Sequence, residues 1–90
     1  MRIHIEAINH NTYKVYVNAT NNTEHLVTVS TELVQRLTQG HANAIYLIEK
    51  SFEFLLQRES NTSILRKFDL LVINRYFPEY EEEMRKTFSA

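Results

Sequence analysis

Apolar and polar side chains alternate through the first 29 residues, and this alternation constrains the fold more than any other feature of the chain. Three short runs show it: RIHIEA (2–7), YKVYVN (13–18) and EHLVTVS (24–30). A period of two in runs of this length is typical of strands with one buried face. The connections are rich in asparagine, which can turn a chain without glycine. The pattern predicts a three-stranded antiparallel meander with Val15 and His25 on its buried face and Tyr16 and Leu26 on its wet face.

From Ser30 onward the apolar residues follow a helical period. Ser30 is predicted to cap a first helix, and Gly40, the only glycine of the chain, is predicted to end it in a left-handed conformation. A second helix is expected at about 43–58, apolar enough to be covered on more than one side. Its predicted stripe consists of Ile45, Ile48, Phe52, Leu55 and Leu56, widened by Leu47 and Phe54.

The last third of the chain is predicted to contain shorter helical pieces. Ile64, Leu65 and Phe68 suggest a helical turn, and Asp69 is a candidate cap for the piece after it. Pro78 suits the first turn of a last helix, whose apolar edge is Tyr80, Met84 and Phe88. Glu81–Arg85 and Glu82–Lys86 fall at the i, i+4 spacing that favours ion pairs.

These patterns predict the α+β class, with three to four helices packed on one face of the meander. Residues 1–90 form a single domain, with strands at about 2–29 and a helical part at about 30–88. The stretch 63–80 is expected to close the core, and Phe68→Ala or Phe77→Ala should each cost about 3–5 kcal/mol. Its inward residues are predicted to be Ile64, Leu65, Phe68, Leu70, Ile73 and Phe77.

Composition restricts the classes of function. The chain has no cysteine and a formal net charge of −1, so disulfides and broad attraction to nucleic acid or anionic lipid are not expected. No apolar run is long enough to span a membrane, and the N-terminal residues do not form a signal sequence. We expect a cytoplasmic protein.

No catalytic, cofactor or metal site is predicted, and we expect that the protein is not an enzyme. A single glycine is too few for a phosphate-binding loop, and no serine stands in a nucleophile motif. The four histidines, His4, His10, His25 and His41, lack the paired spacing of metal ligands. For His25, on the buried strand face, we expect a hydrogen-bonded imidazole.

Arg58, Arg66 and Arg75 have two interpretations. They could bind an anion together, or they could lay their stems on aromatic rings and pair with carboxylates while Asp69 caps a helix. The second interpretation is favoured, because arginines near helix ends in small domains usually serve packing.

Three segments, HLVTVSTELVQRLT, SFEFLLQRES and SILRKFDLLVINRYFPEYEEEM, are similar to a small uncharacterised family of bacterial proteins. The resemblance covers most of residues 25–84. The chain departs from the family pattern at Ser60, where proline is usual, and in using asparagine where the hairpins of the family use glycine. The resemblance implies a bacterial cytoplasmic protein and carries no activity.

The leading hypothesis is a small accessory or regulatory domain that binds a protein, either a second copy or another partner. Tyr16 and Leu26 are its first candidate surface, and Arg66 with Arg75 is the second. The alternative is a dimeric DNA-binding regulator of ribbon–helix–helix type, because residues 24–56 follow the order strand, short helix, long helix. The outward positions Glu24, Leu26 and Thr28 carry no basic side chain and speak against it.

Overall fold

The structure, a computed structural model, describes residues 2–89, so only the terminal residues of the predicted domain lie outside it. The strands are β1 (Arg2–Ala7), β2 (Thr12–Asn18), β3 (Thr23–Thr28) and β4 (Lys67–Asp69). The α-helices are α1 (Thr31–Thr38), α2 (Ala44–Leu56), α3 (Ile73–Tyr76) and α4 (Tyr80–Phe88). Two 3-10 turns, η1 (Asn61–Ser63) and η2 (Leu70–Val72), complete the elements.

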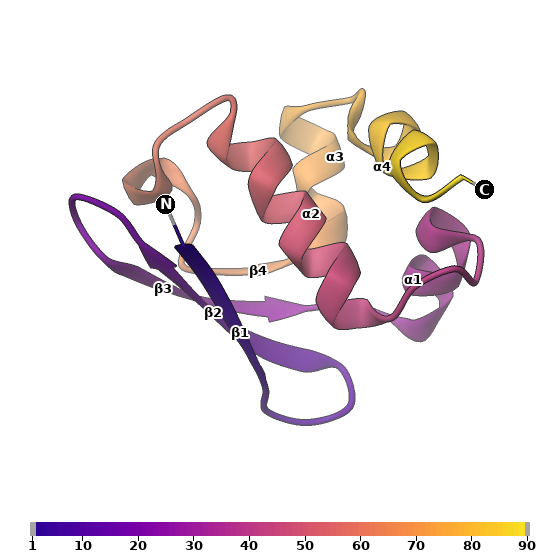
Figure 1. Cartoon of the computed structure of the whole chain (residues 1–90), viewed down its shortest axis with the longest axis horizontal. Coiled ribbons are helices and arrows are strands. Elements are labelled where there is room, and N and C mark those ends of the chain that lie inside the picture. The colour runs from indigo at the N-terminus through magenta and orange to yellow at the C-terminus, as the bar shows by residue number, and fades with distance from the viewer. Residues whose placement is uncertain (1, 90) are drawn as a thin grey trace.

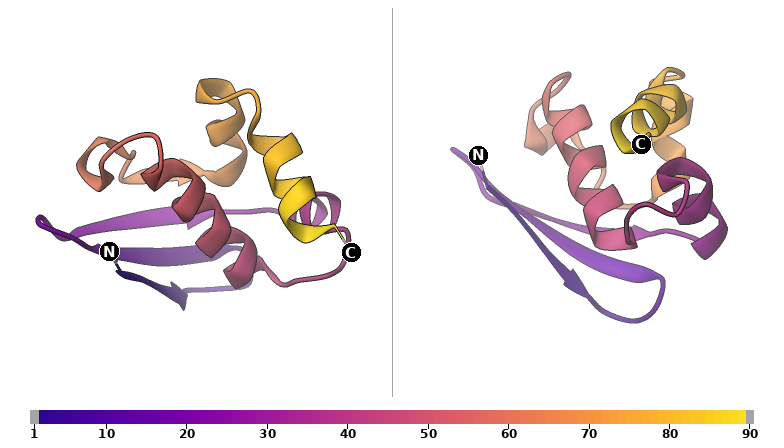
Figure 2. Two further views of the ribbon diagram at one scale, coloured as in Figure 1. Left: turned by 45° about the horizontal axis from the view of Figure 1, so that its top comes forward. Right: turned by 45° about the vertical axis from the view of Figure 1, so that its right-hand side comes forward.

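The predicted α+β class and the N-terminal meander are confirmed. The sheet has the order β1-β2-β3-β4, and its first three strands are antiparallel neighbours. All four α-helices lie on one face of this sheet, and α2 crosses it diagonally (Figures 1 and 2). None of the helices described is long and apolar enough to cross a membrane.

The alternation of the first 29 residues places the side chains as predicted. Val15, Val17 and Val27 are fully buried beneath the helices, and His25 lies among them. Their neighbours along the strands point to the opposite face, where Glu24 is exposed and Tyr16 and Leu26 are half-buried. This second face is called the outer sheet face below.

The prediction of a helical turn at Ile64, Leu65 and Phe68 is wrong. The turn is η1, which ends at Ser63, and the chain then extends into β4, a strand parallel to β3. The Leu26 amide donates to the Arg66 carbonyl at 2.8 Å, so the extended segment satisfies the β3 edge that the meander leaves open. Leu65 consequently points outward and is 46% exposed, contrary to its predicted place in the core.

The predicted face of α2 is also partly wrong. Ile45 is 42% exposed and Leu56 is half-buried. The other residues of the predicted stripe are buried, including Leu47 and Phe54, and Ser51 is buried with them. The helix packs against the sheet on one side and against α4 on another, so its buried surface is broader than one stripe and turned away from Ile45.

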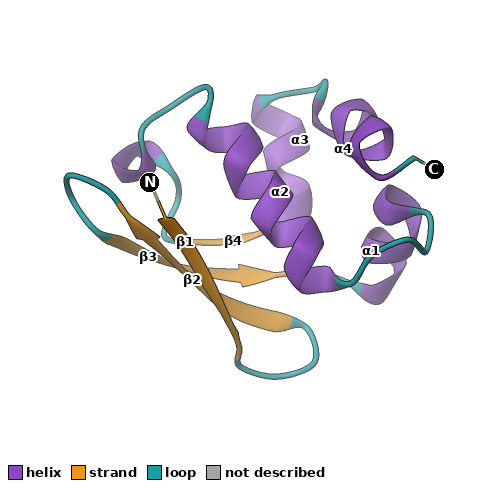
Figure 3. Cartoon of the chain, viewed as in Figure 1, coloured by secondary structure: helices purple, strands orange, loops and turns teal. Residues whose placement is uncertain are grey.

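The caps follow the sequence closely. The Ser30 hydroxyl accepts from the Leu33 amide at 3.0 Å, and the Asp69 carboxylate accepts from the Leu71 amide at 3.0 Å, as predicted. Gly40 has the expected left-handed backbone, with φ of 78°, and Gln39 before it shares that conformation with φ of 55°. The two positive φ angles end α1 and turn the chain toward α2 (Figure 3).

The last helix begins later than Pro78 predicts. Pro78 stands in a turn closed by the Tyr80 amide on the Phe77 carbonyl, and α4 starts at Tyr80. Its predicted apolar edge is buried. Lys86 pairs with Glu82 as expected, at 3.5 Å, but Glu81 pairs with Arg36 of α1 instead of with Arg85.

Candidate functional site

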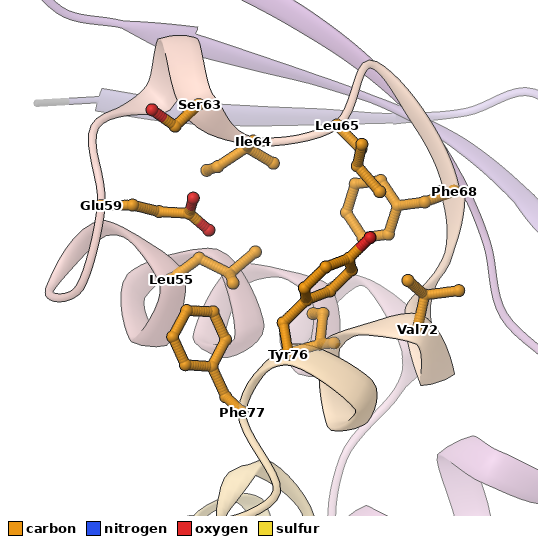
Figure 4. Close-up of a pocket in the computed structure, with 10 residues that line it drawn as sticks. Leu55, Glu59, Ser63, Ile64, Leu65, Phe68, Val72, Tyr76 and Phe77 are labelled. Carbon is orange, nitrogen blue, oxygen red and sulfur yellow. The ribbon is translucent and has the colours of Figure 1, made fainter.

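A small apolar cavity opens between the end of α2 and the segment that follows it (Figure 4). Its volume is about 180 Å³. It is lined by Leu55, Glu59, Ser63, Ile64, Leu65, Phe68, Val72, Ile73, Tyr76 and Phe77. The walls therefore come from α2, from η1 and the extended chain after it, and from β4, η2 and α3. Most of the lining residues belong to the stretch 63–80, which was expected to close the core.

The cavity has a buried floor and an exposed rim. Ile64, Phe68 and Ile73 are buried in the core, so the floor is fixed by close packing. Leu65 and Tyr76 stand at the mouth and are 46% and 65% exposed. The Tyr76 side chain extends across the opening toward Leu65 and Phe68 (Figure 4). Two large side chains thus face water at the mouth of a preformed apolar hollow.

The size of the cavity limits what it can hold. Pockets for cofactors and drug-sized ligands usually measure about 300–1,000 Å³, whereas an apolar cavity of about 150 Å³ holds one benzene molecule. A space of about 180 Å³ therefore suits one apolar side chain, such as leucine or phenylalanine.

The polar groups at the cavity are Glu59, the Ser63 hydroxyl and the Tyr76 hydroxyl. The Glu59 carboxylate points into the cavity (Figure 4), and its side chain is half-buried. The Ser63 hydroxyl lies 3.5 Å from the Ser60 hydroxyl.

A buried chain of hydrogen bonds fixes the wall formed by residues 61–65 against β3. The Asn61 amide group donates to the Asn21 carbonyl at 2.7 Å and to the Thr23 hydroxyl at 2.9 Å. The Thr23 hydroxyl lies 2.9 Å from Nε2 of His25, whose Nδ1 lies 2.7 Å from the Leu65 carbonyl. Because a carbonyl can only accept, Nδ1 carries the proton and Nε2 of the neutral ring accepts from Thr23.

This arrangement favours the neutral imidazole. Burial lowers the pKa of His25, the bond to the Leu65 carbonyl opposes that effect, and the charge of Arg66 adds to the lowering. The hydrogen-bonded imidazole predicted at this position is confirmed, and its partner is a residue 40 positions further along the chain.

The predicted surface residues Tyr16 and Leu26 lie on the outer sheet face, away from the cavity. Tyr16 is paired across strands with Glu24, and Leu26 with Lys14, so the two residues are diagonal neighbours. The Lys14 ammonium lies 3.8 Å from the Glu24 carboxylate and 5.9 Å from the centre of the Tyr16 ring. Charged side chains therefore divide this face, and the apolar area around Tyr16 and Leu26 is small.

Arg66 and Arg75 are exposed and come from different elements, the chain before β4 and α3. Asp69 accepts from the Thr28 hydroxyl and the Leu71 amide, and none of the ion pairs found within residues 2–89 involves Arg66, Asp69 or Arg75. Arg58 follows the packing interpretation, because its guanidinium stacks 3.5 Å from the centre of the Phe54 ring and pairs with Glu79 at 3.4 Å.

The topology bears on the ribbon–helix–helix alternative. In such dimers the strands of two subunits pair with each other. Here β3 is paired with β2 on one edge, and β4 pairs with Leu26–Thr28 on the other edge, so half of that edge is occupied within the chain.

Within residues 2–89, no three His, Asp or Glu side chains gather closely enough to hold a metal ion. Comparison with protein-family models, with curated proteins and with solved structures found no match.

Sequence reasoning assigned no role to Glu59 or Tyr76 and placed Leu65 in the core. One signal pointed toward the cavity: residues 63–80 carry more large apolar side chains than a single helical face can bury.

Proposed function

We propose that this protein is a small cytoplasmic accessory or regulatory domain from a bacterium, and that it acts by binding another protein. The cavity bounded by Leu55, Ile64 and Phe77 is the docking site, and it takes one apolar side chain of the partner. The bacterial, cytoplasmic setting rests on the family resemblance and on the composition of the chain.

The observation that carries this proposal is the contrast between the buried floor of the cavity and its exposed apolar rim. Leu65 and Tyr76 keep much of their surface in water although a packed core lies directly beside them. A partner side chain that enters the cavity would cover both residues, and burial of one such side chain contributes about 1.5–3 kcal/mol. In known interfaces, a few anchors of this kind carry most of the binding energy.

The proposal includes no enzymatic activity. The cavity is smaller than a typical substrate site, and its polar lining offers one carboxylate and two hydroxyl groups without an activated nucleophile.

Selection from a displayed library of random peptides tests the proposal. We expect the bound pool to be enriched in peptides with a single apolar anchor. Their binding should be lost on Leu65→Ser or Tyr76→Ser and retained on Ile45→Ser, a matched control at an exposed isoleucine outside the cavity. If Tyr16→Ser and Leu26→Ser abolish binding while the rim variants retain it, the docking site is the outer sheet face instead. A pool without enrichment would contradict a peptide-binding role.

A further inference from the structure

We infer that the partner carries a lysine or arginine directly next to the apolar side chain that enters the cavity. This inference rests on the proposed function and adds a charge requirement to it. The cation would pair with the Glu59 carboxylate and stack on the Tyr76 ring.

Glu59 is placed to act as an anionic anchor. Its backbone amide donates to the Leu55 carbonyl at 2.9 Å, which ties the residue to the last turn of α2. Its carboxylate points into the apolar hollow (Figure 4), and the residue as a whole is half-buried. None of the ion pairs found within residues 2–89 includes it. When a partner side chain fills the hollow, the carboxylate loses part of its hydration, and a cation beside it compensates for that loss.

The neighbouring arginine does not supply that cation. Arg58 bonds the Glu79 carboxylate with Nε at 3.4 Å and the Phe54 carbonyl with a terminal nitrogen at 2.9 Å. Its guanidinium also stacks on the Phe54 ring. These three contacts direct Arg58 to Phe54 and Glu79, which do not line the cavity, although its guanidinium also lies 5.9 Å from the centre of the ring of Phe77, which does. Glu59 is therefore left to pair with a cation of the partner.

The ring of Tyr76 at the mouth of the cavity offers a second contact for the cation. Tyr76 is the more exposed of the two rim residues, and no cation of the described chain stacks on its ring. An aromatic face attracts ammonium and guanidinium groups. The cavity has room for one apolar side chain, so the cation of the adjacent partner residue would remain at the mouth, between Glu59 and Tyr76.

The test uses short Ser/Gly peptides, acetylated and amidated, that differ only at two central residues. These residues are Leu-Arg, Leu-Gln, Phe-Arg, Phe-Gln or Ser-Arg. Binding is followed by NMR through the methyl shifts of Leu55, Ile64 and Leu65, because one anchor gives weak affinity. We expect the arginine peptides to bind about fivefold more tightly than their glutamine counterparts at low salt, with a smaller ratio at high salt. Ser-Arg should leave the cavity methyls unshifted.

Glu59→Gln separates the charge from the shape of the cavity. In this variant the advantage of the arginine peptides should fall well below fivefold, to the part that the Tyr76 ring contributes, while the affinity for the glutamine peptides stays unchanged. Glu83→Gln, which removes an exposed glutamate of α4, is the matched control and should keep the fivefold ratio.

The outcomes distinguish the inference from the proposed function. If the glutamine peptides bind as tightly as the arginine peptides, or if the ratio persists in Glu59→Gln, the charge requirement is wrong and the docking site stands. If neither leucine nor phenylalanine peptides shift the cavity methyls, the docking site itself is wrong, and the inference fails with it.

Discussion

The Nδ1 atom of His25 lies 2.7 Å from the carbonyl oxygen of Leu65, and this bond ties the inner strand β3 to a wall of the cavity. The ring is buried, and Thr23 occupies its other nitrogen at 2.9 Å. A single histidine thus joins the core of the sheet to the segment that carries the exposed rim residue Leu65.

The first prediction concerns the pH dependence of stability. Burial lowers the pKa of His25 below its ordinary value of 6.5, so the unfolded chain takes up the proton first as the pH falls. The free energy of unfolding should therefore be highest above pH 6.5 and should fall as the pH drops through 6.5 toward the lower pKa of the folded state.

Urea melts between about pH 7.5 and about pH 5 measure this effect, because carboxylates titrate mostly below that window. His25→Gln should be less stable overall but flatter with pH. His4, His10 and His41 are common to both proteins, so the difference between the two curves isolates His25. Parallel curves would show that the buried ring does not couple folding to protonation.

A second prediction concerns Asn61, which holds the wall at its other end. Asn61→Ala removes two hydrogen bonds, to the Asn21 carbonyl and to the Thr23 hydroxyl, and leaves Thr23 with only its bond to His25. We expect a loss of about 1–3 kcal/mol in the free energy of unfolding. Asn18→Ala, at an exposed position at the end of β2, is the control and should change stability by less than about 0.5 kcal/mol. Equal effects would mean that the network adds nothing to stability.

A third prediction uses the buried pair Ser51 and Tyr80, whose hydroxyl oxygens lie 2.6 Å apart. Ser51 donates to the Leu47 carbonyl at 2.7 Å, so the proton between the two hydroxyls belongs to Tyr80. In Tyr80→Phe, Ser51 keeps its bond to Leu47, and the cost should be about 0.5–1.5 kcal/mol. In Ser51→Ala the buried Tyr80 hydroxyl loses its acceptor, and the cost should be about 1–3 kcal/mol.

Thermal or urea unfolding of the two variants gives the comparison. Each substitution removes one hydroxyl group, but Ser51→Ala should have the larger effect, since it leaves a buried donor without an acceptor and Tyr80→Phe does not. The reverse order would mean that the tyrosine proton is directed elsewhere.

A fourth prediction separates Phe68 from Phe77, which the sequence treats alike. Phe68 is buried and its ring centre lies 6.1 Å from that of Phe52, so Phe68→Ala should cost about 3–5 kcal/mol. Phe77 is half-buried at the cavity, and Phe77→Ala should cost less. A urea melt in which Phe77→Ala is the more damaging change would contradict this packing.

Much of the sheet can be predicted from sequence because a period of two over six residues leaves one possible buried face. The caps at Ser30, Gly40 and Asp69 can also be predicted, because the conformation of a helix end depends mainly on residues close in the sequence. The strand β4 has only three residues, too few to show any period, and it exists because β3 offers an open edge. The orientation of α2 was similarly undetermined, since apolar residues surround most of its circumference.

The candidate site was harder to predict for a related reason. Its lining comes from segments that only the tertiary fold brings together, and its most informative residue, Glu59, is one glutamate among ten in the sequence. Glu59 differs from the other glutamates because its carboxylate points into the cavity. The same holds for the ion pair of Glu81 with Arg36, in which a tertiary contact replaces the helical spacing that the sequence suggests.

The most direct test of the docking site is a methyl NMR titration of the intact protein with the Phe-Arg and Leu-Arg peptides. We predict shift changes on Leu55, Ile64, Leu65 and Ile73, which surround the cavity, and none on Leu26 of the outer sheet face. Shifts centred on Leu26, or no shifts on the cavity methyls at any peptide concentration, would contradict the assignment of the cavity as the place where this protein meets its partner.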